Sequence, residues 1–252
     1  MNGEGRIRVG TSGWVFKEWR GAFYPEGLPQ TQWLGYFAKK FDTVEVNSTF
    51  YHLASAATFE RWGQTAPADF LFSVKVDRLI THRKKLRDCG EVLAQFLERA
   101  ELLRSHLGPI LYQLPPHWRV DVERLREFLT LLPAEFHHVL EFRDPSWCTA
   151  AVRDLLAANN INWCIHDMPG HDWPAWVTGP VVYIRFHGAS TQKYAGSYRL
   201  TDLARWAQRM RNHAANGHDV FAYFNNDIHG HAVRNARELL DMLQPAGAGS
   251  QE

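Results

Sequence analysis

Short runs of apolar residues alternate along the chain with longer runs in which apolar residues recur at helical spacing. The short runs are rich in Val, Ile and Phe and are bounded by turn-forming residues, as is typical of β-strands. We predict eight strands, at Ile7–Thr11, Thr43–Asn47, Phe70–Val76, Ile110–Leu114, His138–Phe142, Ile161–His166, Val181–Phe186 and Val220–Phe224. Because most intervals between them can hold a helix, the strands are predicted to run parallel.

In the longer runs, apolar residues lie three or four positions apart, which is the spacing of one helix face. We predict helices at Thr31–Phe41, Ser55–Ala66, Gly90–His106, Val122–Leu132, Ala150–Ala158, Thr201–Ala215 and Ala232–Leu243. Thr31 and Thr201 are predicted to cap the helices that they begin. The interval Asp167–Pro180 differs, because it holds three prolines and two glycines. Proline lacks a backbone donor, so we expect a loop there with at most a short helix.

The number of strands and the chain length together indicate the fold. The chain has 252 residues, and a single (β/α)8 barrel typically has about 250. The predicted fold class is α/β: one TIM-type barrel of parallel strands, with helix 6 short or replaced by a loop. Residues 1–252 are assigned to this single domain because no linker divides them. Its ordered core is expected over about residues 6–243, and residues 245–252 are expected to form a frayed tail.

The composition of the chain indicates which kinds of binding partner to expect. The net charge is only +1 with neutral histidines, so no global field attracts nucleic acid, which stays an open but disfavoured partner. A membrane partner is not expected, since no apolar run reaches the roughly 18 residues of a membrane span. The three cysteines form no CxxC pair, which favours a reducing compartment, and we expect a cytoplasmic protein. The oligomeric state is not indicated.

Polar residues gather on one face of the predicted strands. Side chains alternate sides along a strand, so Leu140 and Phe142 face the helices while Glu141 and Arg143 face the barrel centre. The same rule places inside the barrel Ser12, Glu45, Asn47, Ser73, Lys75, Gln113, Glu141, Arg143, His166, Tyr183, Arg185, His187, Tyr223, Asn225 and Asp227. Almost all of them end their strands, and barrel enzymes hold their active sites at that end. We therefore predict a functional pocket at this mouth.

The residue types at the mouth indicate candidate roles. Lys75, Arg143 and Arg185 favour an anionic ligand, because Arg presents paired donors to phosphate or carboxylate. The candidate catalytic residues, able to transfer protons, are Glu45, Glu141, His166, His187 and Asp227. The candidate substrate-binding residues are Ser12, Trp14, Asn47, Tyr51, Lys75, Gln113, Arg143, Trp147, Tyr183, Arg185, Asn225 and Asn226. Structural interpretations stay open: Glu141 with Arg143, or Glu45 with Lys75, as ion pairs, and His166 as a core histidine.

Several motifs also resemble one family. They are Gly10–Trp14, Thr43–Tyr51, Phe72–Lys75, Leu114–Pro116, Glu141–Trp147, Trp163–Asp167, Tyr183–Gly188 and Tyr223–Asp227. Together, in this order, they are similar to the DUF72 family, also called YecE-like, and the similarity spans roughly Ile7 to Leu243. The resemblance implies a TIM-type barrel. It implies little about activity, because the family is known mainly as a domain of unknown function.

Three classes of function fit these residues. The first is an enzyme acting on a small phosphorylated or carboxylated metabolite, with the cations binding the anion and a glutamate or histidine transferring a proton. The second is metal-dependent phosphoester hydrolysis, or another reaction on nucleic acid, using a divalent metal held by carboxylates and imidazoles. No residue is assigned as a metal ligand, and the cofactor stays unknown, with a divalent metal as the open candidate. The third is a non-catalytic module that binds an anion.

Overall fold

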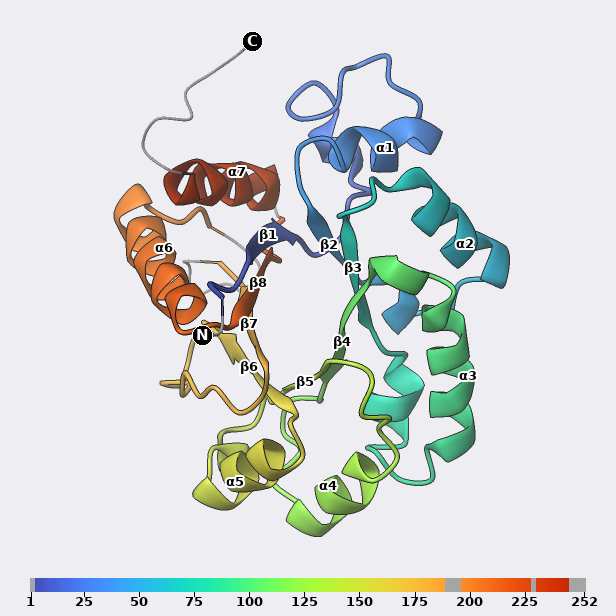
Figure 1. The fold of residues 1–252 in the computed structure, drawn as a ribbon, viewed down its shortest axis with the longest axis vertical. Coiled ribbons are helices and arrows are strands. Elements are labelled where there is room, and N and C mark those ends of the chain that lie inside the picture. The colour runs from blue at the N-terminus through green and yellow to red at the C-terminus, as the bar shows by residue number, and fades with distance from the viewer. Residues whose placement is uncertain (1–2, 189–195, 228–229, 245–252) are drawn as a thin grey trace.

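Eight strands form the centre of the molecule. The computed structural model of the chain describes residues 3–188, 196–227 and 230–244. The strands are β1 (Ile7–Thr11), β2 (Thr43–Val46), β3 (Leu71–Lys75), β4 (Leu107–Gln113), β5 (His138–Glu141), β6 (Asn162–His166), β7 (Val181–Phe186) and β8 (Asp219–Phe224). Each ladder is parallel, and the strand order is β1-β8-β7-β6-β5-β4-β3-β2. This is the predicted α/β architecture, a nearly closed barrel of TIM type surrounded by helices (Figure 1).

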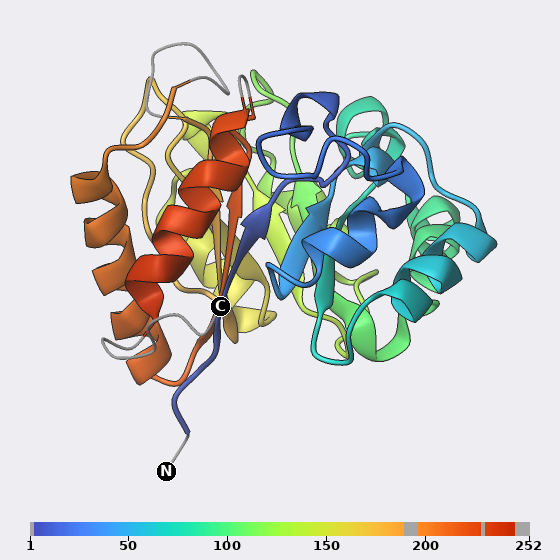
Figure 2. The ribbon, with the colours of Figure 1, turned by 90° about the horizontal axis from the view of Figure 1, so that it is seen from above.

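The helices pack around the outside of the strands. They are α1 (Trp33–Phe37), α2 (Ala56–Thr65), α3 (Gly90–Glu101), α4 (Val122–Leu129), α5 (Ala150–Ala158), α6 (Leu200–Ala215) and α7 (His231–Leu243). Figure 2 shows α6 and α7 on one side of the strands and α1, α2 and α3 on the other. Within the described ranges, no helix has the length and apolar character needed to cross a membrane.

Two predicted helix caps are wrong. Thr31 lies inside the 3₁₀ turn Gln30–Gln32, and α1 begins two residues later without a side-chain cap. Leu200 already belongs to α6, whose N-cap is Arg199, so Thr201 lies two residues too late to cap it. Thr149 does cap its helix, because its hydroxyl accepts a hydrogen bond from the amide of Val152.

Residues 167–180 connect β6 to β7 through turns and irregular backbone. Side chains tie this connection to the barrel: the indole of Trp163 donates to the carbonyl of Pro174, at 3.0 Å. The hydroxyl of Thr178 donates to the carbonyl of Ile161, at 2.7 Å. The predicted tail at residues 245–252 lies outside the described part of the chain.

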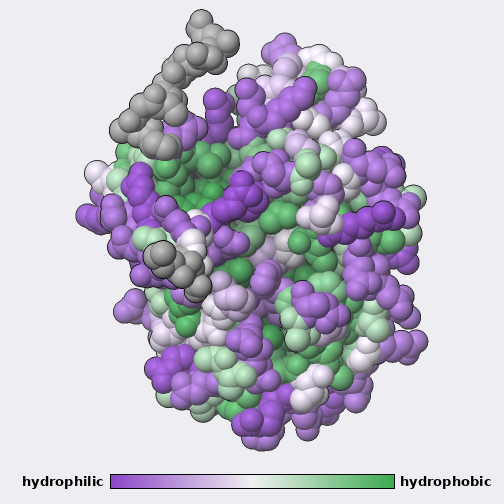
Figure 3. Space-filling model, viewed as in Figure 1, coloured by the Kyte–Doolittle hydropathy of each residue, from purple (hydrophilic) through white to green (hydrophobic). Residues whose placement is uncertain are grey.

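The two faces of the strands form two separate apolar clusters. Leu140, Phe142 and Ile184 belong to the larger cluster, which lies between the strands and the helices. Val139, Tyr183 and six further residues with the same orientation form a smaller cluster inside the barrel. The alternation predicted from the sequence is therefore observed on β5 and β7. Hydrophilic residues cover the outer helices, and hydrophobic residues show mainly in recesses between them (Figure 3).

The barrel closes at a seam between β1 and β2. These two strands meet through a single parallel bridge, Ser12 to Glu45, whereas β1 forms five register pairs with β8. The backbones come close together at Gly10, because a Cβ atom there would lie 2.3 Å from the carbonyl oxygen of Thr43. The seam therefore has less backbone hydrogen bonding than the other strand junctions, and glycine permits its tight contact.

Candidate functional site

A buried guanidinium joins two of the predicted carboxylates. One terminal nitrogen of Arg185 on β7 donates to Glu45 at the end of β2, at 2.7 Å, and the other donates to Glu141 at the end of β5, at 2.6 Å. All three side chains have no exposed surface. Burial of a charge costs several kcal/mol unless opposite charges compensate it, so these groups stabilise each other as a unit.

Arg143 and His187 extend this unit, and we call the five residues the buried charge network. The Nε of Arg143 donates to Glu141, and one of its terminal nitrogens lies 2.8 Å from Nε2 of His187. A guanidinium can only donate, so Nε2 of His187 accepts and the ring is neutral. Burial and the charge of Arg143 lower the pKa of His187 well below its usual value, in agreement with that assignment.

Two residues missed by the sequence reasoning support His187. Asp167, directly after β6, accepts a hydrogen bond from the backbone amide of His187 at 2.7 Å and another from the hydroxyl of Tyr198. Burial raises the pKa of Asp167 to about 6. Asp167 could have been predicted as a site residue, because it directly follows His166 at the end of a strand. Tyr198 follows a long loop, and no periodicity indicated its position.

Glu45 is also held by neutral donors. Ser12 and Tyr183 each donate a hydrogen bond to one of its carboxylate oxygens, both at 2.7 Å. The hydroxyl of Tyr183 also lies 2.7 Å from that of Ser73 on β3. The predicted inward residues of β1, β2, β3 and β7 therefore meet, and both Glu45 oxygens are fully engaged within the protein.

Lys75, the last residue of β3, is the unmatched cation of the site. Its side chain is 7% exposed, and its ammonium lies 4.1 Å from the ring centre of Phe50. Among the described residues it makes no ion pair, so the predicted alternative of a Glu45–Lys75 pair is wrong: Glu45 binds Arg185 instead. Burial, followed by the charge of Arg185, lowers the pKa of Lys75 to about 7.

His166 lies near the network but is occupied by the backbone. Its Nε2 lies 2.9 Å from the carbonyl oxygen of Phe142, and its Nδ1 accepts from the amide of Met168 at 3.3 Å. Burial lowers its pKa to about 4, so the ring is neutral at physiological pH. The structure therefore supports the interpretation of His166 as a hydrogen-bonded core histidine.

Several other predicted residues do not join the network. Asp227 accepts from the indole of Trp19, and its burial raises its pKa to about 7. The amide nitrogen of Asn226 donates to Asn235 on α7, at 3.1 Å. Trp147 donates to the carbonyl of Trp118 and stacks on Phe142 in the outer layer, so it does not wall the mouth. Gln113 donates to the carbonyl of Leu114, Tyr51 is 68% exposed, and Asn225 is half-buried.

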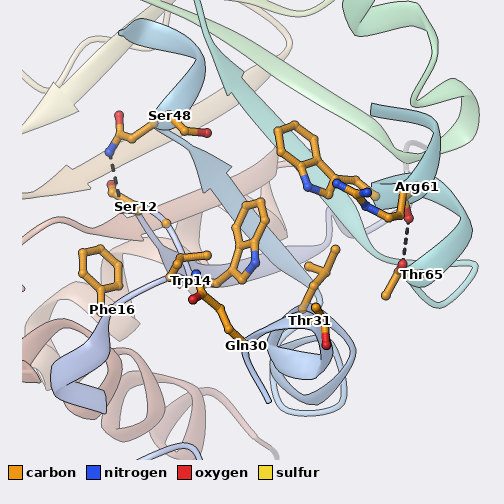
Figure 4. A pocket seen from close by; sticks show the side chains of 13 residues that line it. Ser12, Trp14, Phe16, Gln30, Thr31, Ser48, Arg61 and Thr65 are labelled. Atoms are coloured by element: carbon orange, nitrogen blue, oxygen red, sulfur yellow. Dashed lines mark hydrogen bonds between the residues drawn. The ribbon is translucent and has the colours of Figure 1, made fainter. Parts of the chain in front are cut away.

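The predicted residues Ser12, Trp14 and Asn47 line a cavity of about 520 Å³ at the seam, which we call the seam cavity. Residues from the loop before α1 and from α2 complete it, including Gln30, Thr31, Arg61 and Trp62. In Figure 4, Trp14 lies at its centre, between Phe16 and Thr31. The sequence reasoning missed Gln30, Arg61 and Trp62, because they lie on helical segments whose place beside the mouth follows only from packing.

The carboxylates and imidazoles considered for a divalent metal are not gathered into one group among the described residues. Across the residues that the structure describes, no group of three His, Cys, Asp or Glu side chains is placed to hold a metal ion. These carboxylates already have other partners: Glu45 and Glu141 bind Arg185, and Asp227 accepts a hydrogen bond from Trp19. The charged groups at the strand ends therefore hold one another.

Known proteins resemble the chain in sequence and in structure. It is 33% identical to the UPF0759 protein YecE of Escherichia coli strain K12 over 112 residues, which are 44% of this chain and 41% of YecE. It is 23% identical to the UPF0759 protein YunF of Bacillus subtilis strain 168, over 94% of both chains. The crystal structure of a DUF72 family protein from Thermotoga maritima superposes with a TM-score of 0.85 at 28% identity, covering 94% of this chain and 99% of that one.

A second crystal structure, of a DUF72 family protein from Enterococcus faecalis, has the same fold, with a TM-score of 0.80 at 20% identity over 94% of this chain and 95% of that one. The sequence profile described as "Protein of unknown function DUF72" matches residues 8–252. The resemblance of the motifs is thereby confirmed, and the chain belongs to the DUF72 family.

Proposed function

We propose that this protein is an enzyme acting on a small anionic metabolite, phosphorylated or carboxylated, at the carboxyl-terminal mouth of the barrel. The proposal rests on one observation, that Lys75 is buried at the mouth without an ion-pair partner among the described residues. Arg143 and Arg185 are paired with Glu141 and Glu45 within the buried charge network. Lys75 forms no such pair, so an anionic ligand beside it would stabilise its protonated form.

The geometry divides the cations into two roles. Arg185 has no exposed surface and binds two carboxylates, so we assign it to orienting Glu45 and Glu141. Arg143 and Lys75, with side chains slightly exposed, are the groups that we assign to the ligand. Arg143 is already oriented by Glu141 and His187, and a fixed guanidinium binds phosphate or carboxylate with less loss of entropy.

Lys75 is also the best candidate for proton transfer. A pKa of about 7 allows it to accept and release a proton at physiological pH. Glu141 suits that task less, because Arg143 and Arg185 offset its burial and hold its pKa well below its usual value. We therefore propose Lys75 as the acid–base group and Glu141 as the carboxylate that orients Arg143.

Titration calorimetry with inorganic phosphate and with oxalate tests the anion site. We expect Arg143→Ala and Lys75→Met to weaken binding by about tenfold or more, since a hydrogen bond to a charged group contributes about 1.5–3 kcal/mol. Arg126→Ala is the matched control, because the side chain of Arg126 is 56% exposed on α4. Absence of anion binding to the wild type would refute the proposal. If the protein binds a metabolite and releases it chemically unchanged, it would be a non-catalytic anion-binding module instead.

The same titration has an expected pH dependence. A bound anion favours the protonated amine and raises the pKa of Lys75, so binding takes up a proton above the free value of about 7. Affinity should therefore fall as the pH rises from 7 to 9, by up to about tenfold per unit. Phosphate should be measured together with an anion whose charge is constant in this range, such as oxalate. Lys75→Met should remove the pH dependence of oxalate binding. If the affinity of that variant for oxalate still falls between pH 7 and 9, the assignment is contradicted.

A further inference from the structure

The seam cavity has an apolar floor and a polar rim. Trp14 and Trp62 are less than 10% exposed and form the floor with Leu34. Exposed side chains, including those of Gln30 and Arg61, form the rim. At about 520 Å³ the cavity has the size of a typical site for a small molecule, and its combination of aromatic and separate polar groups is usual for such sites.

The polar groups of the cavity are largely unused. The indole nitrogens of Trp14 and Trp62, the guanidinium of Arg61 and the side-chain amide of Gln30 make no hydrogen bond to another described residue. The oxygen of the Asn47 amide is buried without a partner, while its nitrogen makes only a long bond of 3.4 Å to the carbonyl of Ser12. The cavity thus offers several unused hydrogen-bonding groups to a ligand, on Trp14, Trp62, Arg61 and Gln30.

The shape and charge of the cavity restrict the ligand. The rings of Trp14 and Trp62 meet edge to face, at 86°, so they form no parallel slot for a flat base. None of the lining residues is acidic, and Arg61 is the one cation among them. A ligand with many hydroxyl groups suits this lining, because each hydroxyl can both donate and accept, and its C–H groups can contact the indole edges.

The cavity adjoins the proposed anion site. Ser12 lines the cavity, and its hydroxyl also donates to Glu45 of the buried charge network at 2.7 Å. Figure 4 shows Ser12 and Ser48 at one end of the cavity and Arg61 at the other. Ser12 therefore lies between the cavity and the buried charge network, beside the carboxyl ends of β1 and β2.

We propose that the seam cavity binds a sugar unit of the ligand whose anionic group lies at the mouth. The substrate class is thus a sugar phosphate or a sugar acid. That one ligand occupies both the mouth and the cavity rests on the proposed function. Sugar binding in the cavity does not depend on it and can be measured separately.

Nuclear magnetic resonance of the ¹⁵N-labelled protein tests the cavity directly. The chain has ten tryptophans, and Trp14→Phe and Trp62→Phe identify the two indole signals of interest. Titration with glucose or ribose should shift these two signals saturably, while acetamide, which has no ring of hydroxyls, should not. If neither sugar shifts them, or if acetamide shifts them equally, the inference is overturned.

Rim variants then test which side chains bind the sugar. Gln30→Ala and Arg61→Ala alter exposed residues, so they should keep the fold and weaken sugar binding about fivefold each, the effect of one lost hydrogen bond. Arg126→Ala again serves as the control. Unchanged sugar affinity in both rim variants would contradict the assignment of the cavity.

The two proposals can fail separately. Neutral sugars do not require Lys75, so Lys75→Met should keep the indole shifts even though it weakens anion binding. If the wild type binds sugars but no anion, only the proposed function is refuted. If it binds anions but sugars do not shift the indole signals, only sugar binding in the seam cavity is refuted. Ribose 5-phosphate should bind at least about tenfold more tightly than either ribose or phosphate. Equal affinities would show that the two sites do not bind one ligand.

Discussion

Arg185 has no exposed surface and has a carboxylate at each terminal nitrogen of its guanidinium. Such a residue is costly to bury alone and stabilising only as part of a matched set. Its removal leaves Glu45 and Glu141 less compensated in the same buried space. The stability of the barrel interior therefore depends on the whole set of charges.

We expect Arg185→Met to lower the free energy of unfolding by about 3–5 kcal/mol, the range for removing one partner of a buried ion pair. Urea denaturation followed by circular dichroism measures it. Arg126→Met, at an exposed site on α4, should change the free energy of unfolding by less than about 0.5 kcal/mol. Adding Glu45→Gln and Glu141→Gln to Arg185→Met should recover part of the loss. An unchanged urea midpoint in the single variant would show that the pairing contributes nothing.

At the residue scale, the sequence could predict which face a side chain takes but not which partner it meets. Alternation placed Glu45, Glu141 and Arg185 on the inner face, and the structure agrees. The choice of Arg185 over Lys75 as partner of Glu45 depends on register and side-chain reach across the barrel. Trp147 lies in the loop beyond β5, where alternation makes no prediction, and it packs in the outer layer rather than at the mouth.

At the scale of elements, β5 shows how one strand serves two environments. Leu140 has no exposed surface and packs in the outer cluster, whereas Glu141 beside it belongs to the buried charge network. A shift of register by one residue would place the carboxylate among the helices. The apolar residues of the outer face therefore determine where the charges point.

Leu140→Ala should lower the free energy of unfolding by about 2–5 kcal/mol, because it leaves a cavity between β5 and the helices. Thermal and chemical denaturation measure this cost. Leu131→Ala is the matched control. Because Leu131 is 41% exposed, this change should lower the free energy of unfolding much less. Similar losses in the two variants would mean that the outer cluster does not provide the expected stabilisation.

Element type was easier to predict than element length. Each predicted strand has a counterpart in the structure, because apolar runs bounded by turns are local signals. The predicted helix Thr31–Phe41 is shortened to Trp33–Phe37, flanked by tighter turns. The single bridge between β1 and β2 had no local signal, since it depends on how the barrel closes.

At the scale of the whole molecule, the seam combines weak backbone pairing with tight contact. Gly10→Ala would place a methyl group 2.3 Å from the carbonyl oxygen of Thr43, so β1 and β2 must separate. We expect a loss of about 1–3 kcal/mol in the free energy of unfolding, as for an overpacked core. Gly35→Ala in α1 is the control, because the nearest atom to its new methyl lies 3.8 Å away and alanine favours a helix. Equal stability of the two variants would show that the seam can open freely.

The pairing of β1 also affects how the protein is made. Ile7 is synthesised long before its ladder partner Val220. An incomplete chain that lacks β8 would expose the unpaired edges of both β1 and β7, and such edges recruit strands from other chains. We therefore expect the pairing of β8 with β1 and β7 to reduce aggregation of a newly synthesised barrel.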